Sequence, residues 1–107
     1  MKEYSKSELE SLLHSGDVKI VTDALLYLTF NVNDYSWVQE KCLQLLDNYN
    51  EDVIGLAITC LGHIARIYSN IDRDKVIPAL RKKAMDTRFT GRVEDAIDDI
   101  NIFVTKE

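Results

Sequence analysis

The sequence predicts an all-α protein, a short α-solenoid made of about three helical pairs. Six segments place apolar residues at helical spacing, and none alternates between apolar and polar residues for long enough to predict a strand. The segment at residues 51–68 is the most apolar, because two neighbouring apolar strips leave it only one polar side. A helix of this kind packs between two neighbours, so we expect it at the centre of the fold.

The first pair is predicted at the N-terminal end. Ser5 and Ser7 each precede a glutamate by three residues, the spacing of a capping box, and the first helix is expected to close at Gly16. Asp17 can cap the second helix, which is expected to run to the turn-like residues 31–34. The predicted core faces comprise Leu9, Leu12 and Leu13 in the first helix, and Ile20, Val21, Ala24, Tyr27 and Leu28 in the second.

The second pair contains the central helix. Ser36 and Gln39 offer a capping box for the helix before it, and the polar residues 47–50 end that helix. In the central helix, Gly55 and Gly62 lie seven residues apart and form a surface that another helix can approach closely. The predicted core faces comprise Trp37, Val38, Cys42, Leu45 and Leu46 in the first helix, and Val53, Leu56, Ala57, Cys60, Leu61, Ile64, Ile67 and Tyr68 in the second.

The third pair follows the polar residues after Tyr68. Asp72 or Asp74 can cap its first helix, and Pro78 predicts that this helix begins near Asp74 or kinks at the proline. The last helix is expected to start around residues 91–92. The predicted core faces comprise Val76, Ile77, Leu80 and Ala84 in the fifth helix, and Val93, Ala96, Ile97, Ile100, Phe103 and Val104 in the sixth.

Internal similarity indicates that one unit is used three times. A shift of 33 positions places Leu12, Leu13, Val21, Ala24 and Leu28 on Leu45, Leu46, Ile54, Ala57 and Leu61. A shift of 39 positions places Asp47, Ala57, Leu61 and Ile64 on Asp86, Ala96, Ile100 and Phe103. Each unit thus carries a small alanine in its second helix, and stacking the units buries surface that a single pair would leave exposed.

Composition bounds the function classes. The 107 residues, 46% of them hydrophobic, predict one domain spanning 1–107. The net charge of −5 argues against a protein that tracks nucleic-acid phosphates and favours a basic partner. With no signal segment and no long apolar run, the chain is expected to be cytoplasmic. Cys42 and Cys60 lie on apolar faces and are expected to be buried, reduced thiols.

Two levels of resemblance follow from these patterns. Leu-Leu-Asp at residues 45–47, followed by Asp52-Val53-x-Gly55-Leu56-Ala57, is similar to the two-helix HEAT repeat. More narrowly, the run that begins with residues 37–43, passes through 60–66 and ends with 91–100 resembles a family of small bacterial HEAT-like proteins, a match that covers about two thirds of the chain. The sequence departs from the repeat pattern at Ile54, where an arginine usually ties neighbouring repeats, so we expect an apolar contact there.

The resemblance implies a role in toxin immunity. Members of that family include immunity proteins of contact-dependent growth inhibition (CDI) and related polymorphic toxin systems, which bind and block the C-terminal toxin domain, commonly a nuclease. It implies a cognate toxin domain as the partner, a basic nuclease in view of the acidic charge of this chain, with no direct binding of nucleic acid or membrane. The free protein is expected to be a monomer. A HEAT-like adaptor or scaffold with a non-toxin partner is the alternative.

The candidate partner-binding residues fall into two groups. Four carboxylates of the sixth helix lie opposite its apolar stripe, as either a docking face for a basic toxin domain or a solvated face. Three aromatic residues could anchor a partner, although the tryptophan could equally pack on the core. The two groups are Glu94, Asp95, Asp98 and Asp99, and Tyr35, Trp37 and Tyr49.

The sequence offers little for catalysis or cofactors. Cys60 and His63 are three residues apart, but no second pair with metal-ligand spacing accompanies them, so no metal site is predicted. A thiol on an apolar face has a raised pKa, which argues against cysteine catalysis. We therefore expect a protein that is not an enzyme and needs no cofactor. A nucleic-acid binder that uses Arg81, Lys82, Lys83, Arg88 and Arg92 is a third possibility, which the net negative charge disfavours.

Overall fold

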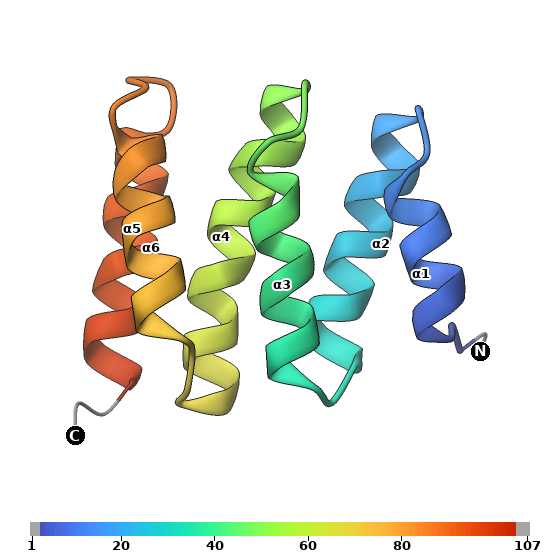
Figure 1. Cartoon of the computed structure of the whole chain (residues 1–107), viewed down its shortest axis with the longest axis horizontal. Helices are drawn as coiled ribbons and strands as arrows, with labels where there is room; N and C mark the ends of the chain where they lie inside the picture. The colour runs from blue at the N-terminus through green and yellow to red at the C-terminus, as the bar shows by residue number, and fades with distance from the viewer. Residues whose placement is uncertain (1–2, 105–107) are drawn as a thin grey trace.

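Six α-helices account for most of residues 3–104, the part of the chain that the computed structural model describes (Figure 1). No strand occurs in this range, so the predicted all-α class is confirmed. The helices are α1 (Lys6–Leu13), α2 (Val18–Asn31), α3 (Tyr35–Leu45), α4 (Glu51–Tyr68), α5 (Arg73–Ala84) and α6 (Thr90–Phe103).

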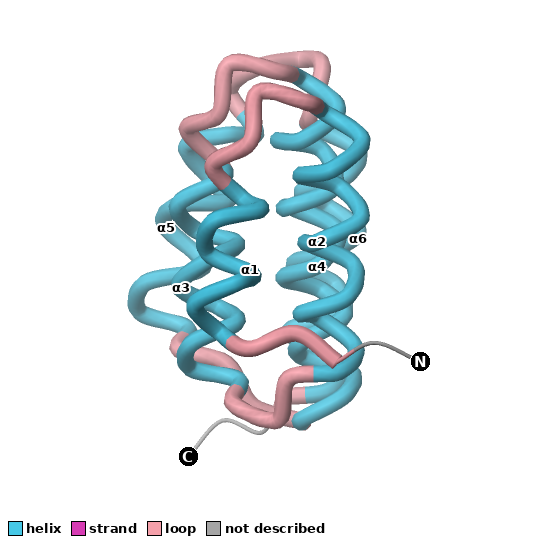
Figure 2. Tube along the Cα trace, turned by 90° about the vertical axis from the view of Figure 1, so that its right-hand side faces the viewer, coloured by secondary structure: helices cyan, strands magenta, loops and turns pink. Residues whose placement is uncertain are grey.

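The helices form two layers, which Figure 2 shows edge-on. The first helices of the pairs, α1, α3 and α5, make one layer, and α2, α4 and α6 make the other, here called the second-helix layer. Each first helix packs on its partner, and α4 packs on α2 and α6 as well as on α3. The central position predicted for the helix at residues 51–68 is therefore confirmed. The result is a slab of 36 × 29 × 19 Å.

The core follows the internal repeat closely. The three equivalent alanines, Ala24, Ala57 and Ala96, are only 4%, 0% and 2% exposed. Their small side chains let the helix backbones approach, as in other stacked repeats. The other equivalent positions that are buried in both of their units are Leu13 and Leu46, Val21 and Ile54, Leu28 and Leu61, and Leu61 and Ile100.

The helix starts confirm two predicted caps and correct a third. Ser5 forms the capping box with Glu8, and the Asp17 side chain accepts from the first backbone N–H groups of α2. For α3, the predicted box at Ser36 and Gln39 is wrong. The helix begins at Tyr35, and Asp34 caps it by accepting from the Trp37 N–H at 3.2 Å. Because Asp34 is the N-cap, Ser36 and Gln39 lie inside the helix, and the Gln39 side chain is available for another contact.

The Gln39 amide instead joins the second and third pairs. The side chain is only 3% exposed, and its Oε1 accepts from the backbone N–H of Asp72 at 2.7 Å. A buried amide is costly unless it is hydrogen-bonded, so this contact both satisfies Gln39 and fixes the start of α5. Asp72 is the N-cap of α5, without a side-chain capping bond.

One predicted helix boundary shifts, and another is confirmed. The first helix ends at Leu13 with His14 as its C-cap, so Gly16 does not close it. The fifth helix begins at Arg73, as expected near Asp74, and continues through Pro78. Proline removes the bond that its N–H would make to the carbonyl of Asp74. Both residues are exposed, so water can satisfy that carbonyl.

Some residues predicted for the core face are on the surface. Ile20, Ile67 and Phe103 are 40%, 46% and 39% exposed. Phe103 differs from its repeat equivalent Ile64, which is fully buried, because it lies in the last turn of the last helix. Conversely, Leu25 was not predicted to be in the core and is fully buried.

Candidate partner-binding surface

The four predicted carboxylates of α6 do not form one face. Glu94, Asp95 and Asp98 are exposed, whereas Asp99 is half-buried against α4. A methyl carbon at Gly62 would lie 3.0 Å from Oδ2 of Asp99, which places this carboxylate in the seam between the two helices. Residues four apart share a side of a helix, so Asp95 lies toward the α4 side with Asp99, and Glu94 and Asp98 lie further round, away from α4.

Charge is distributed unequally between the two layers. Helices α2, α4 and α6 contain seven acidic and three basic residues, whereas α1, α3 and α5 contain four acidic and seven basic residues. Much of the basic excess comes from Arg81, Lys82 and Lys83 at the end of α5. The segregation of charge noted in the sequence thus belongs to whole layers, and the second-helix layer is the acidic side of the molecule.

The three predicted aromatic anchors are dispersed. The ring of Tyr35 lies 6.0 Å from that of Tyr68, centroid to centroid, and its hydroxyl oxygen accepts from Asn70 at 3.2 Å. Tyr49 is 78% exposed, and its hydroxyl donates to the carbonyl of Gly16 at 3.3 Å. Tyr35 is the first residue of α3, whereas Tyr49 lies in the turn that follows the other end of α3. The aromatic group therefore cannot form one patch with the acidic helix.

Trp37 has a structural contact in α1. Its half-buried ring is flanked by the ammonium groups of Lys6 and Lys41, which lie 5.3 and 5.4 Å from the ring centroid. Lys6 also pairs with the capping residue Asp34 at 2.6 Å. The arrangement joins α1 to the start of α3 and fits the packing interpretation of Trp37.

The sequence interpretation missed an exposed apolar group on the second-helix layer. Phe30 is 54% exposed, Leu26 is 40% exposed, and Ile102 is 71% exposed. They lie in α2 and α6, outside the predicted core faces of those helices. Apolar residues that fall off a predicted core face are the signal that could have identified them, because such side chains must either meet another element or face water.

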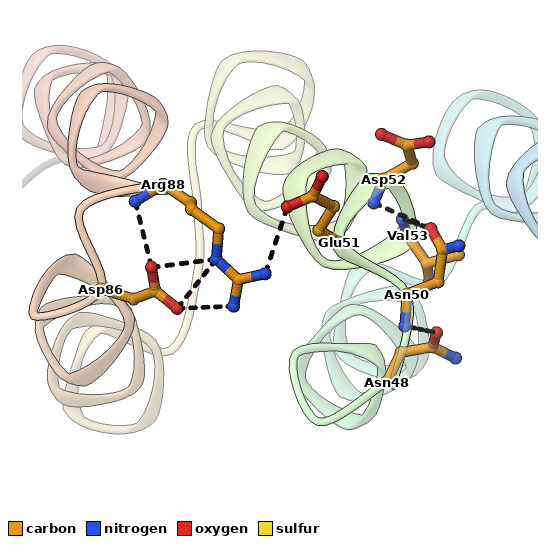
Figure 3. Close-up of polar contacts among 7 residues, drawn as sticks. All are labelled: Asn48, Asn50, Glu51, Asp52, Val53, Asp86 and Arg88. Atoms are coloured by element: carbon orange, nitrogen blue, oxygen red, sulfur yellow. Dashed lines mark hydrogen bonds and ion pairs between the residues drawn. The ribbon is translucent and has the colours of Figure 1, made fainter.

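Two of the predicted basic residues already have partners. Figure 3 shows the guanidinium of Arg88 between Asp86, at 2.7 Å, and Glu51, at 3.1 Å. The side-chain hydrogen bond from Arg88 lowers the pKa of Asp86 to about 2. Arg92 donates to the carbonyl of Gly55 at 3.3 Å and to the hydroxyl of Thr59 at 3.2 Å.

These contacts tie the third pair to α4. The cluster around Arg88 joins the α5–α6 turn to the first residue of α4, beside the cap formed by Asn50 (Figure 3). Ile54 is 6% exposed, in keeping with the apolar contact expected there. Arg92 of α6 nevertheless makes polar contacts with α4 and so links neighbouring repeats. The sequence pattern did not predict this link.

The two cysteines are free and buried. A hydrogen bond with Cys60 and burial raise the pKa of Cys42 well above its usual value, and the same bond lowers that of Cys60. His63, which follows Cys60 by three residues in the sequence, packs its ring 5.2 Å from the ring of Phe30. Within residues 3–104, no three His, Cys, Asp or Glu side chains lie close enough to hold a metal ion.

Comparison with solved structures finds a similar chain in a CDI complex. A chain in the crystal structure of a CDI complex from Cupriavidus taiwanensis LMG 19424 superposes with a TM-score of 0.85 at 25% identity, over 97% of this chain and 94% of that one. No protein-family model and no curated protein sequence matches. In the described part of the chain, no helix is both long and apolar enough to cross a membrane. The chain is therefore similar, over almost its whole length, to a component of a CDI complex.

Proposed function

We propose that this protein is an immunity protein of a contact-dependent growth inhibition system, a HEAT-like binding protein that neutralises its cognate toxin domain. One observation carries the proposal: the likeness to a chain of a CDI complex extends over nearly the full length of both chains. The resemblance of residues 37–43, 60–66 and 91–100 to the HEAT-like family supports the same conclusion independently.

The surface supports inhibition by binding. The second-helix layer has seven acidic and three basic residues, which suits a basic toxin domain such as a nuclease. Complementary charge speeds association, and an inhibitor must bind before its target acts. Nuclease domains need basic surfaces to hold phosphates, so an acidic layer that covers such a surface would also exclude the substrate.

The proposal includes where and how the protein works. A toxin that acts on cytoplasmic nucleic acid must be inhibited in the cytoplasm. We therefore propose that the immunity protein is located there and is a monomer when free. It acts without catalysis and without a cofactor. An adaptor role with a non-toxin partner becomes the better explanation if the cognate domain is not bound.

The experiment pairs this protein with the toxin domain encoded immediately upstream. Co-expression should restore growth of cells that make the domain, and a pull-down should recover the two proteins together. Charge reversal of the exposed pair Glu94→Lys and Asp98→Lys should slow association, most clearly at low salt. Asp95→Lys tests the side nearer α4. Asp99 is left unchanged because its half-buried carboxylate lies against Gly62.

A matched control separates the docking face from net charge. Glu40→Lys with Asp74→Lys makes the same charge change at exposed residues of α3 and α5, in the other layer. This variant should bind nearly as well as the unmodified protein. Equal loss in both variants would show that only overall charge matters. Failure of the unmodified protein to bind or protect would contradict the proposed function itself.

A further inference from the structure

A continuous line of side chains crosses the C-terminal ends of the three helices of the second-helix layer. We call it the outer stripe; its members are Leu26, Phe30, His63, Arg66, Ile67 and Phe103. The ring of Phe30 lies 5.2 Å from that of His63, and the guanidinium of Arg66 lies 5.6 Å from the ring centroid of Phe103. His63 and Arg66 are neighbours one turn apart on α4. The contacts therefore join α2, α4 and α6 without a break.

The repeat architecture explains why these residues meet. The helices of this layer run in the same direction, so their last turns lie along one edge (Figures 1 and 2). Phe30, Arg66 and Phe103 each lie in the last turn of their own helix. A surface of this kind exists only when three units are stacked, which is why neither one helix nor one repeat predicts it.

The outer stripe leaves much apolar surface facing water. Phe30 is 54% exposed, Ile67 46%, Leu26 40% and Phe103 39%. Burying apolar surface contributes about 25 cal/mol per Å², so a group this large gains considerably from being covered. Exposed apolar groups rimmed by polar residues mark interaction sites more often than single exposed residues do.

The chemistry of the outer stripe suits a protein partner. Aromatic residues and arginine are enriched among the residues that carry most of the binding energy at interfaces. Within the described residues, the guanidinium of Arg66 makes no ion pair or hydrogen bond, and its contact is the ring of Phe103. Its guanidinium is therefore available to a carboxylate or carbonyl of a partner, held in position by the ring.

Charge decides which partner is expected. The outer stripe belongs to the layer with seven acidic and three basic residues, and the exposed carboxylates of Asp95 and Asp98 are on the helix that ends at Phe103. A nucleic acid would be repelled by this layer, and a second copy of the chain would bring a like net charge of −5 against it. A basic protein surface with an apolar centre complements both features.

We propose that the outer stripe is the apolar centre of the surface that docks the basic toxin domain, with the carboxylates of α6 at its rim. The inference rests on the proposed function and specifies its site. The partner contributes an apolar side chain that packs between Phe30 and Phe103, surrounded by lysine or arginine. In this arrangement the stripe supplies affinity through slow dissociation, and the acidic rim supplies the rate of association.

The test measures binding of purified toxin domain to Phe30→Ser and to the double variant Phe30→Ser with Phe103→Ser. Central interface residues typically cost tens of fold or more when truncated, so the double variant should weaken binding at least ~100-fold, mainly in the dissociation rate. Phe30→Ser alone should retain the parent melting temperature, and it keeps the test valid if the double variant folds poorly. The control is Met85→Ser, an 85% exposed apolar residue at the end of α5, which should change binding less than about twofold.

The outcomes separate the site from the function. If the unmodified protein binds the domain and both Phe variants bind equally well, the outer stripe is not the docking centre, while the proposed function stands. If the unmodified protein does not bind, both proposals fail. If the free protein self-associates and Phe30→Ser abolishes that association, the occupant is a second copy of the chain, which also overturns the inference.

Discussion

The closeness of α4 and α6 gives a quantitative test of the packing. A Cβ at Gly62 would lie 3.3 Å from the Cα of Ala96 and 3.0 Å from a carboxylate oxygen of Asp99. The carboxylate can rotate away, but the Ala96 backbone can retreat only if α6 moves. A helical glycine replaced by alanine gains about 1 kcal/mol of helix propensity, and overpacking costs about 1–3 kcal/mol. Gly62→Ala should therefore change stability by about 0 to −2 kcal/mol.

Two other glycines act as internal controls. Gly91 has no heavy atom near the position of an added Cβ, so Gly91→Ala should be neutral or stabilise by up to about 1 kcal/mol. At Gly55 the nearest atoms, at 3.1–3.3 Å, belong to the side chain of Arg92. Arg92 can swing out at the loss of its hydrogen bonds to Gly55 and Thr59, which would offset the gain in propensity.

The assay is urea unfolding followed by circular dichroism at 222 nm. The series Gly91→Ala, Gly55→Ala, Gly62→Ala and Gly62→Leu should run from most to least stable. Gly62→Leu adds three further carbons to the seam and should cost about 3 kcal/mol, equivalent to a shift of about 1–3 M in the urea midpoint. Equal midpoints for Gly62→Leu and Gly91→Ala would refute the close approach of α4 and α6.

Two further predictions test the repeat and the charge cluster. Ala57→Asp should destabilise the fold by about 3–5 kcal/mol, because it buries an unpaired charge between helices, and Ala24→Asp and Ala96→Asp should behave alike in melting curves; an unchanged melting temperature in all three would contradict the repeat alignment. The pKa of Asp86 is about 2 in the folded state, so its stabilising contribution is complete above the unfolded value near 4 and disappears as the pH falls through 2; an NMR titration should find this midpoint, and Arg88→Gln should return it toward 4.

The fold was predictable because packing repeats along the sequence. Apolar spacing located all six helices, and the shift of 33 residues identified Ala24 and Ala57 as equivalent positions, which are both buried. The excess of negative charge on α6 was also evident from the sequence. Each of these properties depends on side chains within one helix or one repeat, so a helical wheel and an alignment are sufficient to find them.

The contacts between repeats were not predictable in the same way. Gln39 resembles a capping residue at three-residue spacing, yet its amide binds the backbone of Asp72, 33 residues later. On a helical wheel Asp99 lies opposite the apolar stripe of α6, yet it packs against Gly62 because α6 lies close to α4. Both errors have one cause: the orientation of one helix against the next depends on the crossing geometry, which the periodicity of a single helix does not contain.

The same dependence on stacking links stability to the proposed binding. The outer stripe includes Phe30 from α2, Arg66 from α4 and Phe103 from α6. Its geometry therefore depends on the two seams of α4, which are its contacts with α2 and with α6. Those seams are held by buried alanines, by Gly62 and by the tie from Arg92 to Gly55. A rigid surface loses little conformational entropy when a partner binds. Close packing at the centre of the layer therefore serves to preorganise the exposed side chains at its edge.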